Sequence, residues 1–325
     1  MLDVTAIGEL LIDFTCTDRN TQGYPVMKAH PGGAPANFLA ALAKFGAKTA
    51  LLGKVGDDSF GHLLCDTLRQ NNVCTDGLVI DPAVFTTLAF VSLDDGGERS
   101  FSFARKPGAD TQLRFEELDL NLIERAKVFH FGTLSLTHEP ARSTTRQAVA
   151  HAKQMGKLIT FDPNLRPPLW EDMEDARREM LWGLSQADVV KLSEDEAEFL
   201  FGLSPEESAA HIRNRYGVKL VFVTCGAKGC WFENQLGRGH VDAPTGISAT
   251  DTTGAGDIFG GSAVWSLLQT GKGPEQLTDG ELTEITRFAC SAATLSTQIS
   301  GGISSVPELE EVRRLAASFY KGDLA

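Results

Sequence analysis

The sequence has 325 residues, of which 42% are hydrophobic, so it can form one large α/β domain or two domains of ordinary size. Its formal net charge of -13 disfavours nucleic acid as a partner, because proteins that bind nucleic acids usually carry a basic patch. The first residues contain no basic segment, and no apolar run approaches the ~18 residues of a membrane span, so we expect a cytoplasmic protein without a membrane partner.

The chain begins with an apolar run, residues 4–14, which is interrupted by glycine and closes near a carboxylate. This pattern predicts a buried strand with Asp13 exposed at its end. A carboxylate in that position is a good acceptor for hydroxyl groups. The alternative is an aspartate that only forms a turn.

Paired glycines precede the next predicted element, a helix over residues 38–46 that ends at glycine. Gly32 and Gly33 give a ligand close access to the backbone. Asn37 offers both a hydrogen-bond donor and an acceptor, as sugar hydroxyl groups require.

Two runs typical of strands, 86–93 and 100–103, flank the turn-forming sequence Asp-Asp-Gly-Gly at 94–97. This arrangement predicts a β-hairpin. By its pattern alone, the hairpin can belong to the edge of the main sheet or to a separate small sheet.

From residue 122 onward, predicted strands and helices alternate. Strands are expected at 128–131, 158–161, 189–192 and 220–224, with helices at 141–154 and 172–184. Strands separated by helices imply right-handed βαβ units and a parallel sheet, on which ligands bind beyond the carboxyl ends of the strands. Polar segments follow three of these strands, at 162–166, 193–196 and 224–229. The last two have ordinary alternatives, a helix N-cap and a hairpin turn.

The segment 251–257 precedes an uncharged run, 258–271, which predicts a buried helix. Gly254 and Gly256 allow a tight turn whose N–H groups face one point, and such a turn at a helix N-terminus binds anions such as phosphate. Asp257 then lies beside the anion, where it can take a proton from a hydroxyl group that attacks the phosphate. The alternative is an ordinary loop in which Asp257 caps the helix.

Two of these segments carry a family resemblance. Asp-Thr-Thr-Gly-Ala-Gly-Asp at 251–257 resembles the signature of the ribokinase-like (PfkB) sugar kinases, and Gly-Gly-Ala-Pro-Ala-Asn at 32–37 is similar to the bacterial fructokinase branch. Ala34 stands where ribokinases proper have a lysine. The resemblance runs from Gly8 to Pro307. It implies a single ribokinase-like α/β domain over 1–325, with a central, mostly parallel sheet flanked by helices and a small β-sheet lid formed by about 15–31 and 84–108.

The implied activity is transfer of phosphate from ATP to D-fructose, which gives D-fructose 6-phosphate and ADP. In this reading Asp257 is the general base, and the N–H groups of Gly254, Ala255 and Gly256 stabilise the developing charge together with Arg166. The implied sugar ligands are Asp13, Gly32, Gly33, Asn37, Arg105 and Asp257. Other acceptors, chiefly 2-keto-3-deoxygluconate or ribose, and a catalytically silent sugar sensor are the alternatives.

The resemblance also implies Mg²⁺ with ATP as co-substrate, and K⁺ as a further cofactor. Glu196 matches the family's Asn-x-x-Glu motif, which organises Mg²⁺ through water, although Ser193 replaces the asparagine. The implied ATP-binding residues are Lys191, Thr224, Gly226, Gly229, Gly254 and Gly256. The implied K⁺ site comprises Asp251, Thr253, Ser296, Gly301 and Ser305. A homodimer formed through the exposed lid strands is a further expectation.

Overall fold

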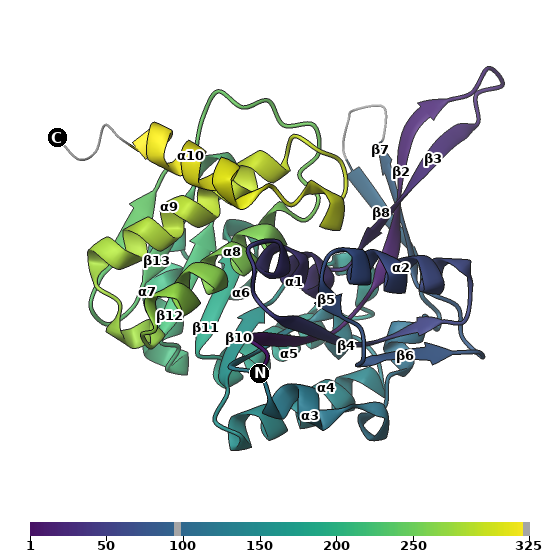
Figure 1. Ribbon diagram of the computed structural model, residues 1–325, viewed down its shortest axis with the longest axis horizontal. Coiled ribbons are helices and arrows are strands. Elements are labelled where there is room, and N and C mark those ends of the chain that lie inside the picture. The colour runs from purple at the N-terminus through teal and green to yellow at the C-terminus, as the bar shows by residue number, and fades with distance from the viewer. Residues whose placement is uncertain (94–98, 321–325) are drawn as a thin grey trace.

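The structure is a computed structural model that describes residues 1–93 and 99–320, and its centre is one large sheet (Figure 1). The strand order is β14-β13-β12-β11-β10-β9-β1-β4-β5, with β6 paired to β4. The pairs from β12 to β5 are parallel, whereas β13 and β14 are antiparallel. The prediction of a mostly parallel central sheet is therefore confirmed. Its strands are β1 (Val4–Ile7), β4 (Thr49–Gly56), β5 (Val73–Cys74), β6 (Leu78–Asp81), β9 (Val128–Gly132), β10 (Leu158–Asp162), β11 (Val189–Ser193), β12 (Leu220–Thr224), β13 (Cys230–Glu233) and β14 (Arg238–Val241).

A second, four-stranded sheet has the order β3-β2-β7-β8 and projects from one side of the body in Figure 1. It consists of β2 (Leu11–Arg19), β3 (Pro25–Gly32), β7 (Leu88–Leu93) and β8 (Arg99–Ala104). The predicted hairpin strands thus join the polar segment after Phe14 in a small separate sheet, as the family resemblance implied. The hairpin turn predicted at 94–97 lies outside the described residues.

The prediction of one strand over residues 4–14 is wrong. β1 ends at Ile7, and β2 starts at Leu11 in the other sheet. The break occurs at Gly8, where φ is +152° and an added Cβ would lie 2.9 Å from Cγ of Pro35. Asp13 consequently lies inside β2, half-buried, rather than exposed at the end of a central strand.

Helices cover both faces of the central sheet. Residues of α1, α2, α8, α9 and α10 pack on one face, and residues of α4, α5, α6 and α7 pack on the other. None of the helices in the described part of the chain is long and apolar enough to cross a membrane. The helices are α1 (Ala34–Lys44), α2 (Ser59–Gln70), α3 (Leu120–Glu124), α4 (Ala141–Gln154), α5 (Met173–Gln186), α6 (Glu194–Phe201), α7 (Pro205–Tyr216), α8 (Ala255–Thr270), α9 (Asp279–Ser296) and α10 (Leu309–Phe319).

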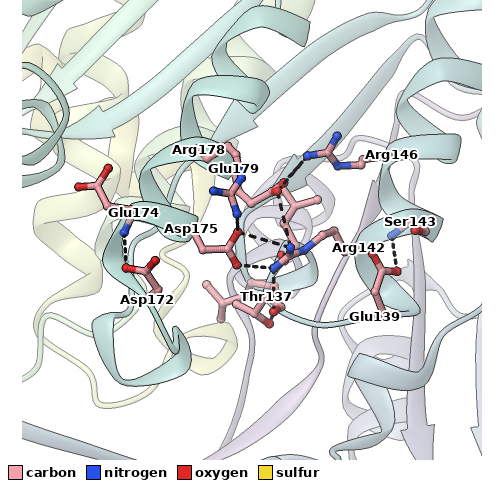
Figure 2. A network of polar contacts seen from close by, with 12 residues as sticks. Thr137, Glu139, Arg142, Ser143, Arg146, Asp172, Glu174, Asp175, Arg178 and Glu179 are labelled. Carbon is pink, nitrogen blue, oxygen red and sulfur yellow. Dashed lines mark hydrogen bonds and ion pairs between the residues drawn. The ribbon is translucent and has the colours of Figure 1, made fainter.

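Ion pairs tie α4 to α5 on the second of these faces (Figure 2). Arg142 lies 2.7 Å from Asp175, and Arg146 lies 2.8 Å from Glu179. Glu179 is only 2% exposed, so its charge depends on these arginines for compensation. This network stabilises the packing of two helices that line neither of the cavities described below.

Candidate active site

Two adjoining cavities lie where β10, β11 and β12 end. The smaller one, here the inner cavity, has a volume of about 390 Å³, and the larger one, the outer cavity, about 560 Å³. They share Ser193, Thr224, Thr252 and Gly256 in their walls. Since ligands of parallel sheets bind beyond the carboxyl ends of strands, both cavities lie at the expected edge.

The turn before α8 separates the two cavities. Gly254 has φ of +76°, which only glycine adopts at low cost, and Asp257 follows in the first helical turn. Asp257 is 8% exposed, and Nδ2 of Asn37 donates a hydrogen bond of 2.9 Å to its Oδ2. Burial raises the pKa of Asp257, although Lys191, the hydrogen bond from Asn37 and Arg166 oppose this shift. The result is an oriented, buried carboxyl group in the first turn of α8. Its role as a general base, and the binding of an anion by the turn, stay predictions.

Lys191 is one of the cations in the wall of the inner cavity. Its Nζ lies 2.7 Å from Oδ2 of Asp162, and a Cβ at Gly256 would lie 3.0 Å from the same nitrogen. Burial lowers the pKa of Lys191, but the nearby carboxyl groups of Asp162, Glu196 and Asp257 outweigh burial and raise it. A charged lysine therefore faces the turn that precedes α8.

Gly32 and Gly33 pack against Asp13 and against the segment that joins β1 to β2. A Cβ at Gly32 would lie 2.5 Å from Oδ2 of Asp13, and Gly33 has φ of +117°. Asp13, Gly33 and Asn37 line the inner cavity together with Arg166. Burial raises the pKa of Asp13 to about 7; Arg166 lowers it, and Asp257 and Asp251 raise it.

Arg105 does not line the inner cavity with these residues. It is 3% exposed, and its Nε and Nη2 donate to Oδ2 of Asp110 at 2.9 and 2.6 Å. Its remaining donors bind Oγ1 of Thr137 at 2.8 Å and the carbonyl oxygen of Leu134 at 2.9 Å. A direct contact between Arg105 and a sugar stays a prediction.

Glu196 is fixed by backbone amides on both oxygens. Oε1 accepts from the N–H of Leu165 at 2.7 Å, and Oε2 accepts from the N–H of Ser193 at 2.8 Å. Ser193 in turn caps α6, because its Oγ accepts from the N–H of Glu196 at 3.2 Å. The N-cap arrangement given above as an alternative is thus present. It leaves further lone pairs on Glu196 for water.

The segment predicted to hold K⁺ is brought together around Asp251. Its Oδ1 accepts from the N–H and Oγ1 of Thr253 at 3.0 and 2.8 Å, and its Oδ2 accepts from the N–H of Gly301 at 3.1 Å. Ser305 and Ser296 are buried, and each donates to a nearby carbonyl oxygen, that of Gly302 and of Ala293 respectively. Their role as K⁺ ligands stays a prediction.

The residues predicted to bind ATP divide between the cavities. Thr224, Gly226, Gly229 and Gly256 line the outer cavity, while Gly254 and Lys191 line the inner one. Apolar side chains form part of the outer wall, including Pro244, Ile247, Phe259 and Ala293. Such partly apolar walls are usual in cavities that bind small molecules. The binding of ATP in the outer cavity stays a prediction.

Several residues of the inner cavity were not predicted from the sequence. They are Glu9, Leu11, Phe103, Leu134 and Asn164. A carboxylate inside an apolar run was an available signal for Glu9, and Asn164 belongs to the polar segment that contains Arg166. Phe103 and Leu134 carry no local signal, because distant parts of the chain bring them to the cavity.

The chain is similar in sequence and fold to carbohydrate kinases. The family model described as pfkB family carbohydrate kinase matches residues 1–309. Fructokinase-1 of Oryza sativa subsp. japonica is 42% identical over 319 residues, which cover 97% of this chain and 98% of the relative. Fructokinase from Xylella fastidiosa, solved with bound ATP, superposes with a TM-score of 0.86 at 29% identity and full coverage of both chains. A double mutant of fructokinase from Vibrio cholerae O395, solved with fructose, ADP and potassium ion, gives a TM-score of 0.86 at 30% identity, with 97% and 98% coverage.

The family match spans nearly the whole chain, and it includes both the paired glycines at 32–33 and the turn before Asp257. The fold, a central parallel sheet with a small separate sheet, is the same as in the solved relatives. The chain therefore belongs to the pfkB family of carbohydrate kinases and is a sugar kinase that transfers phosphate.

Proposed function

We propose that this sugar kinase phosphorylates D-fructose with ATP, giving D-fructose 6-phosphate and ADP. The observation that carries the proposal is the buried Asp257, which Asn37 orients in the wall of the inner cavity, one residue after Gly256, which lines both cavities. The choice of fructose is supported by relatives that are named fructokinase over nearly the full length of the chain.

In the proposed mechanism the sugar occupies the inner cavity, beside Asp13, Gly33 and Asn37, and the nucleotide occupies the outer cavity. Asp257 takes the proton from the attacking hydroxyl group as the oxygen–phosphorus bond forms and ADP leaves. The N–H groups of the turn before α8, with Arg166, stabilise the charge on the transferring phosphoryl group. Because positioning dominates such a reaction, we also propose that the small sheet closes over the sugar and excludes water.

We also propose how the expected cations are bound. Among residues 1–93 and 99–320, no group of three or more His, Cys, Asp or Glu side chains is placed to hold a metal ion. We propose that Mg²⁺ is held chiefly by the ATP phosphates and by water on Glu196, as is common for this ion. When bound, it would neutralise phosphate charge. We further propose K⁺ beneath the turn, at Asp251 and the loop around Gly301, and a cytoplasmic homodimer that forms through the small sheet.

The charges around the inner cavity favour a neutral sugar over a sugar acid. Among the described residues that line it, the cations are Arg166 and Lys191, whereas Glu9, Asp13, Glu196 and Asp257 are carboxyl groups. Lys191 is already paired with Asp162. Arg105 is committed to Asp110, so a carboxylate on the sugar has Arg166 as its main partner.

The test is ADP release with Mg·ATP and K⁺ on fructose, 2-keto-3-deoxygluconate, ribose, glucose and adenosine. We expect a clear preference for fructose. The variant Asp257→Asn keeps the size of the side chain but removes the base, so turnover should fall by about 10²-fold or more while sugar binding survives. Preferred turnover on another acceptor would overturn the choice of fructose, and near-normal turnover in the variant would overturn the role of Asp257.

A further inference from the structure

Glu9 is a buried carboxyl group in the wall of the inner cavity for which the mechanism above has no use. It lies between β1 and β2, is 2% exposed, and lines the cavity with Asp13 and Asn37. Its Oε1 accepts a hydrogen bond of 2.8 Å from the N–H of Ala34, the first residue of α1. A polar group this deeply buried beside a ligand cavity requires an explanation.

The start of α1 explains why the contact with Ala34 is useful. The first N–H groups of a helix have no partner within the helix, and the N-cap residue here is Gly33, which has no side chain to accept from them. Glu9 supplies the missing acceptor from another segment of the chain. One turn further, the N–H of Asn37 donates to the carbonyl oxygen of Gly33 at 2.9 Å, and its side chain donates to Asp257.

We propose that Glu9 is a positioning residue for phosphoryl transfer: it fixes the first turn of α1, and through Asn37 the orientation of Asp257, while its side chain forms part of the sugar-binding wall. This inference rests on the proposed function. Glu9 thus caps α1 and also lines the cavity in which the sugar binds. The connected contacts run from Glu9 to Ala34, along one helical turn to Asn37, and on to Asp257.

The contact needs an acceptor of the right length more than it needs a charge. Burial raises the pKa of Glu9 to about 8; the amides of Glu9 and Ala34 lower it, Asp110 raises it and Arg105 lowers it. Burial thus favours the uncharged acid, which has the shape and the carbonyl acceptor of a glutamine. Glu9→Gln should therefore keep the contact with Ala34. Glu9→Leu should lose it, because leucine has a similar size but no hydrogen-bond acceptor.

The experiment compares Glu9→Gln, Glu9→Leu and the wild type by kcat, KM for sugar, KM for ATP and melting temperature. A matched control is Glu179→Gln, which changes a carboxyl group of equal burial, 2% exposed, in the network of Figure 2. We expect Glu9→Gln to stay within about 3-fold of the wild type, while Glu9→Leu raises KM for sugar by about 10-fold and lowers kcat, because the hydrogen bond to the N–H of Ala34 is lost and the first turn of α1 is no longer fixed. KM for ATP should hardly change. The control should lower the melting temperature and leave both KM values unchanged.

The proposal is overturned if Glu9→Leu loses melting temperature but keeps kcat and KM for sugar, as the control does. Equal increases in KM for sugar and for ATP would also overturn it, because a general loosening then explains the result. If Glu9→Leu does not fold, Glu9→Asp tests the same contact, since it keeps the acid but is one methylene too short. Failure of the proposed function is seen separately: the wild type would then prefer another sugar of the panel, and the variants are compared on that sugar.

Discussion

At the scale of single residues, Lys191 controls the charge of the inner cavity. It forms an ion pair with Asp162, and its positive charge opposes the effect of burial on the pKa of Asp257. Burial raises the pKa of the neighbouring Asp162, and Lys191 lowers it. One cation thus lowers the pKa of two buried carboxyl groups, Asp162 and Asp257.

This arrangement predicts how Lys191→Met changes the pH dependence of the reaction. Without the lysine the pKa of Asp257 rises further, so a larger share of the enzyme carries a protonated base at any given acidic pH. The acid limb of the profile of kcat/KM against pH should therefore move to higher pH. Lys191→Arg, which keeps the charge, should leave the limb near its original position. An unchanged limb in Lys191→Met would exclude this electrostatic role.

The residues that were predictable from the sequence are those whose surroundings are local. Asp257 and Gly254 could be predicted because the turn and the uncharged helix that form this part of the site are consecutive in the sequence. Glu9 could not be predicted, because its partner Ala34 is brought to it by the packing of a separate segment. Arg105 was predicted as a sugar ligand from the resemblance, but its burial against Thr137 and Leu134 could not be predicted. An arginine in a loop is ordinarily exposed, so its burial here was not visible in the sequence.

At the scale of elements, α6 shows how a helix cap and a functional motif use the same residues. Ser193 accepts from the N–H of Glu196, and Glu196 accepts from the N–H of Ser193, which forms a capping box. The family resemblance has asparagine in place of Ser193. Both residue types are good N-caps, so the helix starts in the same way in either case.

We therefore expect Ser193→Asn to keep the stability and the Mg²⁺ dependence of the wild type. Ser193→Ala removes the cap and should destabilise the protein by about 1 kcal/mol. Because the cap also orients Glu196, the alanine variant should require more Mg²⁺ for half-maximal activity. Urea unfolding and Mg²⁺ titration of the activity measure the two effects. A loss of stability without any change in the Mg²⁺ requirement would separate the cap from the metal site.

Elements were predictable where the sequence pattern is periodic and flanked by clear breaks. The strands β9, β10, β11 and β12 and the helices α4 and α5 lie where they were expected, because hydrophobic runs and helical segments are determined within short windows. No helix was predicted at α6 or α7. The run over 4–14 was not resolved into β1 and β2, since both strands are apolar and a single Gly8 divides them. Assignment to two different sheets is decided by pairing partners that are distant in sequence.

At the scale of the whole molecule, the small sheet is attached to the central domain at the two ends of its β7–β8 hairpin. Thr87 directly precedes β7, Arg105 directly follows β8, and both side chains bind the carboxylate of Asp110. Arg105 also binds Thr137 and the carbonyl oxygen of Leu134, in the segment after β9. Both ends of the β7–β8 hairpin are thereby anchored to the central domain at one buried ion pair.

This anchor gives Arg105 a role that differs from the direct sugar contact implied by the family resemblance, and one variant separates the two. Arg105→Met leaves Asp110 buried without its cation, which should cost about 3–5 kcal/mol of stability. Removing both charges in Arg105→Met with Asp110→Leu should recover part of that loss, because the unpaired carboxylate is gone.

Backbone amides of β7 and β8 should exchange with solvent faster in the single variant Arg105→Met, since the hairpin is released at its base. KM for sugar should rise as a consequence, because Phe103 of β8 lines the inner cavity. If the single variant instead keeps its stability and its exchange rates while KM for sugar rises, Arg105 contacts the sugar directly and the small sheet is anchored by other residues.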